Sequence, residues 1–248
     1  MTEQAKIVAE GAAALGVRRG DRLLVHSSLR SLGGGFSPDD VIRGLREALG
    51  EEGTLMFPAL SYESCNAGHP VFDVLRTPSN VGVIPETFRT GTPGVLRSVA
   101  PTHSCCALGP DAAFLTGGHR LDETPCGPNS PFRRLMELDG KILFLGCGMR
   151  PNTSMHAVEE LVEPEYLFGD PVEYEIVLPD GSILRQKCRA HDFRGVVQRY
   201  DRLEPLLGDA VRAGRIAAAP CRLAETPSMW ETALSKYRLD PMYFVDRA

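Results

Sequence analysis

The sequence predicts an α/β fold with a mixed, largely parallel central sheet flanked by helices, and three stretches support this prediction. Residues 22–58 have the pattern strand, helix, strand, which is typical of a parallel βαβ unit. Residues 141–160 join the apolar run KILFLG to a segment with helical spacing. Residues 172–188 alternate apolar and polar residues about the turn PDGS, which predicts an antiparallel hairpin excursion in the C-terminal third.

Local signals place the individual elements along the chain. The segment 37–50 is typical of a helix, because Ser37 can cap its start, Pro38 suits the first position and Gly50 ends it. Further helices are expected at 5–17, 81–90, 132–140, 153–163 and 196–211, and strands at 23–25, 53–60, 103–109 and 141–148. Residues 61–80 are expected to form a long loop that serves a site. With no repeat or linker in the pattern, residues 1–248 predict a single domain.

Composition and charge exclude several classes of function. The 248 residues are 43% apolar and carry a net charge of −5, which argues against nucleic acid as a partner. No apolar run reaches the roughly 20 residues that span a bilayer, so no membrane partner is expected. The seven cysteines include no C-x-x-C pair, so no metal site is indicated. Without a signal-peptide pattern, we expect a cytoplasmic protein with reduced thiols.

Polar residues follow the predicted strand at 23–25 in the stretch VHSSLRSLGG. The carboxyl ends of strands are where open α/β sheets bind ligands, and turn N–H groups beside Arg30 would suit a phosphate or a pantetheine amide. A strand-ending turn whose hydroxyls bond their own backbone explains the pattern equally well.

A second polar stretch, APTHSCCALG, precedes another predicted strand. Cys105 or Cys106 could act as a nucleophile, but neighbouring strand residues point to opposite faces. Cysteine is also commonly a small buried apolar residue, and the stretch on its own favours that interpretation.

The stretch GMRPNTSMHAVEE places a histidine at the start of a predicted helix. Glu159 and Glu160 stand three and four residues after His156, so either carboxylate can reach its ring. A carboxylate on one ring nitrogen fixes the tautomer and leaves the other nitrogen as a base. A solvated acidic helix face with an incidental histidine gives the same pattern, and the pattern alone favours that second interpretation.

Six motifs in one order resemble the aminoglycoside 3-N-acetyltransferase family, antibiotic N-acetyltransferases that differ from the GNAT fold. They are LLVHSSLRSLG, GTLMFPAL, FDVLRTPSNVGVIPETFR, RSVAPTHSCCALGP, TPCGPNSPFRRLMELDGKILFLGCG and NTSMHAVEE. The resemblance covers residues 20–165 and continues more loosely through YDRLEPLL and LDPMYFV. It implies acetyl-coenzyme A as donor, an amine as acceptor and direct transfer without an acyl-enzyme.

The resemblance also implies roles for individual residues. His156 would take the proton from the attacking amine and Glu159 would orient it, within the matching pattern Asn152, Thr153, His156 and Glu159. The acetyl-coenzyme A arm would lie against two stretches: His26, Ser27, Ser28, Leu29, Arg30 and Ser31, and Pro101, Thr102, His103 and Ser104. Glu63, Asp73 and Glu160 are the candidate contacts to the substrate, because a polyamine would bind carboxylates.

The acceptor is expected to be the 3-amino group of the 2-deoxystreptamine ring of an aminoglycoside. The chain departs from the family at Ala100, where many members have histidine, and its stretch SYESCNAGHPVFD is compact for a loop around a bulky sugar. A biosynthetic or metabolic amine is therefore an alternative acceptor. A cysteine-dependent acyltransferase or hydrolase using Cys105, Cys106 or Cys126, and a non-catalytic binder, are alternatives of other classes. Monomer and homodimer are both open.

Overall fold

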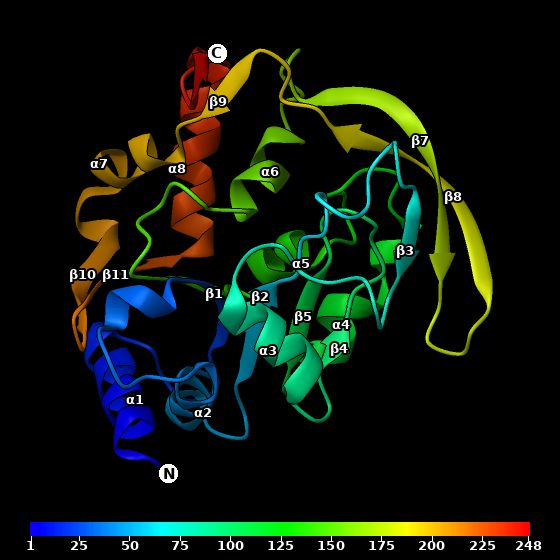
Figure 1. The fold of residues 1–248 in the computed structure, drawn as a ribbon. Helices are drawn as coiled ribbons and strands as arrows, with labels where there is room; N and C mark the ends of the chain where they lie inside the picture. Colours follow the sequence, from blue (N-terminus) through cyan, green and yellow to red (C-terminus); the bar gives the residue numbers. More distant parts are fainter.

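A seven-stranded mixed sheet runs through the centre of the computed structural model, which describes residues 1–248 (Figure 1). Its strands lie in the order β10 (Val211–Ile216), β11 (Ala219–Glu225), β6 (Lys141–Leu145), β1 (Arg22–Ser27), β2 (Thr54–Pro58), β5 (Cys105–Leu108) and β4 (Leu96–Arg97). The central strands β6, β1 and β2 are parallel, and the strands on either side of them pair antiparallel. The predicted mixed α/β class is confirmed, with the parallel pairing at the centre of the sheet.

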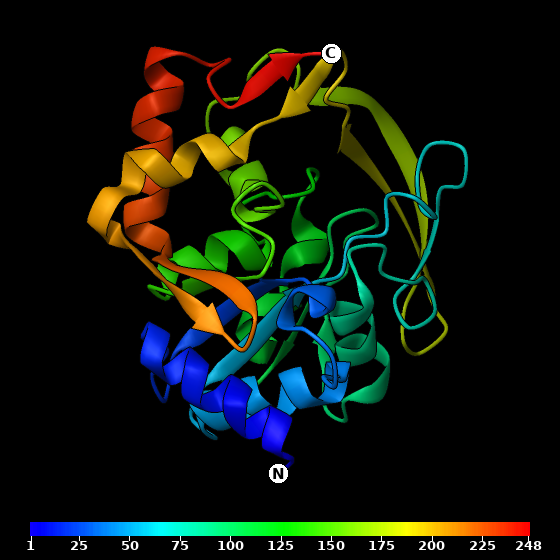
Figure 2. The same cartoon turned by 60° about the vertical axis from the view of Figure 1, so that its left-hand side comes forward.

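Helices cover both faces of this sheet, as Figure 2 shows. One face packs against α1 (Glu3–Leu15), α2 (Pro38–Leu49) and α3 (Val83–Gly91). The other packs against α4 (Ala112–Gly117), α5 (Pro131–Glu137), α6 (Ser154–Glu159), α7 (Glu204–Leu207) and α8 (Thr226–Leu239). Alternate residues of each strand serve the two layers, so Leu23 and Leu143 join the first core and Leu24 and Phe144 join the second.

The helix expected at 37–50 begins as predicted. The Ser37 hydroxyl accepts a hydrogen bond from the Asp40 backbone N–H, and the Asp40 carboxylate accepts one from the Ser37 N–H. This capping box satisfies two N–H groups that would otherwise lack partners, which is why the helix starts there.

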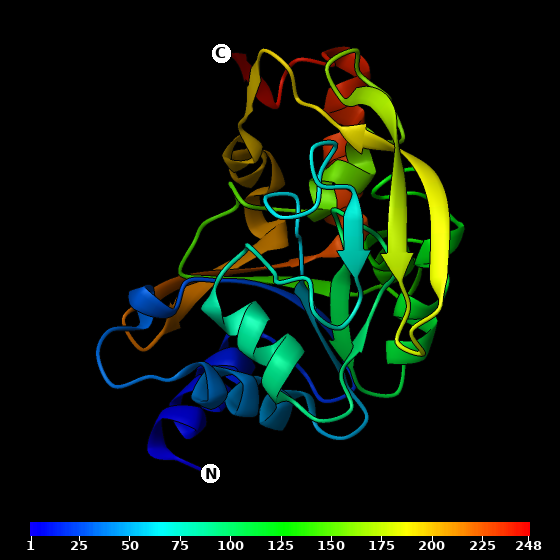
Figure 3. The same cartoon turned by 45° about the vertical axis from the view of Figure 1, so that its right-hand side comes forward.

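The predicted hairpin is confirmed and belongs to a second, smaller sheet. Its strands are β7 (Phe168–Val177) and β8 (Ile183–His191), and the short strand β3 (Val71–Asp73) pairs parallel with β7. Figure 3 shows this three-stranded sheet beside the main body of the protein. The arrowhead of β8 ends close to α6 (Figure 1), so the hairpin brings the end of β8 toward the helix that carries His156.

The C-terminal third differs from the sequence prediction. Residues 196–211, expected as one helix, form β9 (Val196–Gln198), the 3-10 turns η3 (Tyr200–Leu203) and η4 (Gly208–Ala210), and the single turn α7 between them. Strand β9 pairs with β12 (Val245–Arg247). Two further short 3-10 turns are η1 (Leu29–Leu32) and η2 (His119–Leu121). None of the helices combines the length and the apolar character needed to cross a membrane.

Candidate functional site

A cleft of about 450 Å³ opens where α6, the end of β8 and the loop after β2 meet. Its lining residues are Leu60, Tyr62, Val81, His103, Arg150, Pro151, Thr153, His156, His191, Asp192, Phe193, Gln198 and Tyr200. Helix α6 presents His156 to the cleft because its neighbours Met155, Ala157 and Val158 are buried in the core. The cleft therefore has a histidine on a short, firmly packed helix.

Glu159 and Tyr200 contact this histidine at its Nδ1 atom. The Nδ1 atom of His156 lies 3.2 Å from the Glu159 Oε2 atom and 2.9 Å from the Tyr200 hydroxyl. The side chain of His156 is 12% exposed, whereas that of Glu159 is 0% exposed. The interpretation of these residues as a solvated acidic face is therefore wrong.

Three tyrosine hydroxyls donate hydrogen bonds to the Glu159 carboxylate. Tyr200 binds Oε2 at 2.7 Å, while Tyr166 and Tyr237 bind Oε1 at 3.0 and 2.9 Å. Burial raises the pKa of Glu159, but the hydrogen bonds and charge of His156 and the hydroxyls of Tyr200 and Tyr237 lower the pKa below its ordinary value. The carboxylate is therefore ionised although no part of it reaches solvent.

These contacts also determine the tautomer of His156. The Tyr200 hydroxyl has one proton, which it donates to Glu159, so its oxygen accepts a hydrogen bond from the His156 Nδ1–H. The Nε2 atom then carries the lone pair. It has no hydrogen-bond partner within the protein, and the ring lines the cleft. A lone pair at this position can accept a proton from a molecule bound in the cleft.

A second histidine–glutamate pair lies beside the first. Glu160 accepts hydrogen bonds from His191 Nε2 at 2.7 Å, the Cys126 N–H at 2.7 Å and the Thr124 hydroxyl at 2.6 Å. Burial lowers the pKa of His191, although the hydrogen bond to Glu160 opposes this. Because its carboxylate is engaged by these protein groups, Glu160 does not present a free oxygen to a substrate, contrary to the sequence expectation.

His103 completes a group of three imidazoles in the cleft. Its ring lies 4.8 Å from that of His191 and 5.3 Å from that of His156, between ring centroids. Burial and the neighbouring histidines lower the pKa of His103 well below its ordinary value, so this ring is neutral. The sequence motif found His103, but His191 lies at the end of a hairpin strand with no local signal of a site.

A smaller cavity of about 70 Å³ adjoins the cleft and shares Val81, Pro151 and Thr153 with it. It is lined by His26 and Ser27, whose Nε2 and Oγ atoms are buried without a hydrogen-bond partner. Burial, with a smaller effect of His156, lowers the pKa of His26 to about 3. Buried polar atoms without partners are uncommon, so these two are candidates for contact with a bound molecule.

The rest of the stretch 26–31 forms the turn that follows β1. The Ser31 hydroxyl donates a hydrogen bond to the Gly146 carbonyl at 2.8 Å and lies 2.9 Å from the Ser28 hydroxyl. Leu29 packs partly buried against the first core, and Arg30 is exposed. Each of the two interpretations given by the sequence thus applies to part of the stretch. His26 and Ser27 line a cavity, whereas Ser28 and Ser31 form hydrogen bonds that stabilise the turn.

Of the second predicted stretch, only His103 lines the cleft. The Thr102 hydroxyl lies 2.8 Å from His103 Nδ1. The Pro101 carbonyl accepts a hydrogen bond from the Ser61 hydroxyl at 2.8 Å, and the Ser104 hydroxyl donates one to the Ala59 carbonyl at 2.7 Å. These three residues position the ring of His103 and the loop after β2.

The three candidate cysteine nucleophiles are buried in the core. Burial raises the pKa of the Cys106 thiol to about 12 and those of Cys105 and Cys126 well above their ordinary value. Because the thiolate is the reactive form, these cysteines are unsuited to nucleophilic catalysis.

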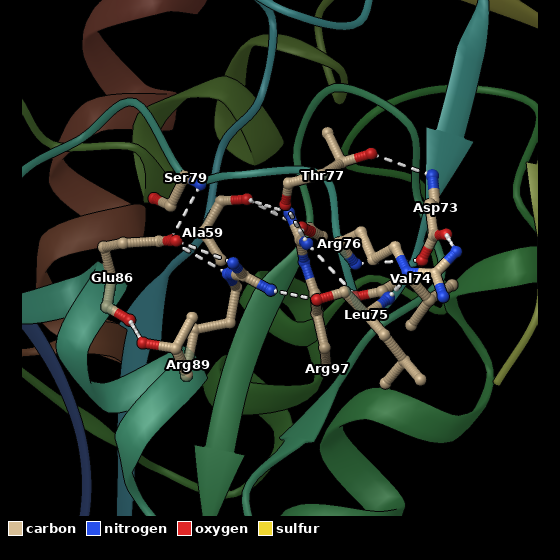
Figure 4. A network of polar contacts seen from close by, with 12 residues as sticks. Ala59, Asp73, Val74, Leu75, Arg76, Thr77, Ser79, Glu86, Arg89 and Arg97 are labelled. Atoms are coloured by element: carbon tan, nitrogen blue, oxygen red, sulfur yellow. Dashed lines mark hydrogen bonds and ion pairs between the residues drawn. The ribbon is translucent and has the colours of Figure 1, made fainter.

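The loop 59–80 is held by arginines, as Figure 4 shows. Arg97 donates hydrogen bonds to the carbonyls of Ala59 and Thr77, and the Asp73 carboxylate accepts them from two backbone N–H groups that follow it. Asp73 thus closes its own turn, and Glu63 is exposed. Neither of these expected substrate contacts lines the cleft.

Comparisons with known proteins show which family the chain resembles. The family model described as aminoglycoside 3-N-acetyltransferase matches residues 24–238. Aminoglycoside N(3)-acetyltransferase IV of a Salmonella species is 34% identical, over 93% of this chain and 86% of its own length.

Two solved structures superpose on nearly the whole chain. AAC-IIIb in binary complex with CoASH has a TM-score of 0.81 and 30% identity, covering 94% of this chain and 95% of its own. A histidine-to-alanine mutant of AAC(3)-IVa in complex with a gentamicin has a TM-score of 0.81 and 32% identity, covering 97% and 90%.

Proposed function

The chain belongs to the aminoglycoside 3-N-acetyltransferase family, and on that premise we propose that it acetylates the 3-amino group of the 2-deoxystreptamine ring of an aminoglycoside. Acetyl-coenzyme A is the donor, and the transfer is direct, with His156 as general base. The observation that carries the proposal is the pair of His156 and Glu159, whose imidazole lines the larger cleft.

The residues of the smaller cavity suit the donor. The unpartnered atoms of His26 and Ser27 are polar groups that the amides of a pantetheine arm, or the carbonyl of its thioester, would satisfy. Bound acetyl-coenzyme A supplies an activated acyl carbonyl. Since Thr153 and Pro151 line both cavities, a thioester held beside them would lie within reach of an amine in the larger cleft.

His156 supplies the base that the chemistry requires. An ammonium group has no lone pair, so a proton must leave the acceptor nitrogen before or during attack. The ammonium loses this first proton to solvent, and the free amine then attacks the acyl carbon. His156 Nε2 takes the second proton of the nitrogen as the carbon–sulfur bond breaks, so the product is a neutral amide and coenzyme A leaves as the thiolate. The ionised Glu159 stabilises the imidazolium that results. General-base assistance of this kind is worth roughly 10²–10⁴ in rate.

A biosynthetic or metabolic amine is the second candidate acceptor, and one observation favours it. Asp192 is the only carboxylate that lines the cleft, and it is ion-paired with Arg194 at 2.9 Å.

All seven cysteines are free thiols, and for either acceptor we propose the reducing cytoplasm as the place of action.

Thiol release from acetyl-coenzyme A by the purified protein tests the proposal. A panel of aminoglycosides with free and with blocked 3-amino groups should give release only where that amine is free. Mass spectrometry and NMR of the product should place one acetyl group on the 3-nitrogen. Equal thiol release from aminoglycosides with free and with blocked 3-amino groups would contradict the proposed regiochemistry. If the protein binds coenzyme A but releases no thiol with any aminoglycoside, the acceptor would instead be a biosynthetic or metabolic amine.

A further inference from the structure

The charges of the cleft do not match a polycationic acceptor. Apart from histidines, Arg150 and Asp192 are the two charged side chains in its lining. Asp192 is compensated by Arg194, while Glu159 and Glu160 lie behind the histidines and accept hydrogen bonds from them. The cleft therefore presents a cation without a matching free carboxylate.

Arg150 has no partner of its own. It is exposed, and no carboxylate or carbonyl oxygen of the protein forms a salt bridge or hydrogen bond with it. The pKa of Asp201 is lowered chiefly by hydrogen bonds from Arg199 and only slightly by the charge of Arg150, and Asp201 pairs with Arg199 at 3.1 Å. The guanidinium of Arg150 thus lines the cleft without a carboxylate bonded to it.

The neighbours of Arg150 restrict its backbone on both sides. Met149 is 1% exposed and packs in the core, and Pro151 restricts the conformation of the residue before it. The backbone of Arg150 therefore lies between a buried residue and a restricted one, and its side chain and His156 both line the cleft.

We propose that Arg150 determines acceptor specificity, so that the enzyme prefers aminoglycosides with the fewest amino groups. This inference rests on the proposed function. Two like charges about 4–6 Å apart in water repel each other enough to weaken binding roughly three- to fivefold for each ammonium group nearby. The rings of Tyr62, Phe193 and Tyr200 offer uncharged contact surface to the sugar instead. Selection thus acts through charge, and salt screens it.

A contact of Arg150 with the phosphates of the donor is the competing role, since Pro151 lies next to both cavities. Kinetics separate the two. We expect Arg150→Gln to lower the KM for gentamicin about three- to tenfold, to lower that for 2-deoxystreptamine less, and to leave the KM for acetyl-coenzyme A within about twofold. The gain should shrink at high salt.

Arg238→Gln is the matched control, because Arg238 is exposed on α8, makes no ion pair and does not line the cleft. It should change none of these constants. A higher KM for acetyl-coenzyme A with an unchanged acceptor KM would overturn the proposal, as would identical constants for Arg150→Gln and the wild type.

Calorimetry makes the test independent of turnover. Gentamicin is titrated into the protein saturated with coenzyme A, for the wild type and for Arg150→Gln. The variant should bind more tightly by the same three- to tenfold factor. Equal affinities, or no binding by either protein, would overturn the role of Arg150, whereas failure of acetylation alone concerns only the proposed function.

Discussion

Two consecutive glutamates each hold a histidine of the same cleft, and the two pairs differ in what their histidines can do. His156, held by Glu159, is 12% exposed, and its Nε2 has no partner in the protein. His191, held by Glu160, is 2% exposed, and its remaining nitrogen is buried without a partner. Both rings line the cleft, but the side chain of His156 is the more exposed of the two.

The donors around each carboxylate explain the difference. Glu159 is surrounded by tyrosine hydroxyls from three separate segments, which keep it charged beneath an accessible imidazole. Glu160 instead accepts hydrogen bonds from the Cys126 backbone N–H, from the Thr124 hydroxyl and from the His191 ring at the end of β8. The first pair suits the proton transfer that we propose, and the second joins three segments at the wall of the cleft. Proximity of histidine and glutamate is therefore not sufficient to identify a base.

Removing His156 should have the largest effect on activity. We expect His156→Ala to lower kcat by at least about 10²-fold, because the variant lacks the cleft imidazole whose Nδ1 is held by Glu159, while coenzyme A binding is preserved. Thiol-release kinetics and calorimetry with coenzyme A measure the two quantities. His69→Ala, which removes an exposed histidine of the loop, is the control. Near wild-type turnover of His156→Ala would show that the wrong histidine has been taken as the base.

Changing Glu160 should affect stability more than catalysis. In Glu160→Gln a buried acceptor of three hydrogen bonds loses its charge, which we expect to lower the free energy of unfolding by about 1–3 kcal/mol. The kcat of the folded protein should fall less than about tenfold, and less than in Glu159→Gln. Thermal unfolding and thiol release compare the two variants. A larger catalytic loss in Glu160→Gln would mean that the second pair takes part in the reaction.

Local signals in the sequence were enough for the fold class and for several of its elements. Four elements formed as expected, and the signal for each lies within one segment. They are α2 with its capping residues, β1 and β6 with their apolar runs, and the hairpin with its turn. The spacing of His156 and Glu159 predicted that the carboxylate could reach the ring, which the structure shows. The spacing alone favoured a solvated helix face, and the resemblance to the family was needed to select the pair.

Long-range contacts could not be predicted in the same way. Glu159 is buried by Tyr200 and Tyr237, which are 41 and 78 residues away. The expected long helix is only six residues in the structure, so the chain turns after Glu159 and later segments cover the face that was expected to be solvated. His191 reaches Glu160 across 31 residues and only through the pairing of β8 with β7. Each of these contacts depends on tertiary packing, which spacing along one segment does not reveal.

The smallest effect is expected from a single tyrosine of the Glu159 group. Tyr237→Phe removes one of its hydroxyl donors and leaves those of Tyr200 and Tyr166, so we expect kcat to fall about two- to fivefold with an unchanged KM. Burial raises the pKa of Glu159 and its hydrogen bonds lower it, so the loss of one bond raises that pKa. The carboxylate is then protonated at a higher pH on acidification, so the stability that it contributes should be lost at a higher pH, which unfolding measured across a pH series would show. Tyr174→Phe is the control, because its hydroxyl is buried without a partner and lies outside the cleft. Identical pH profiles for the two variants would show that the tyrosines only fill space around Glu159.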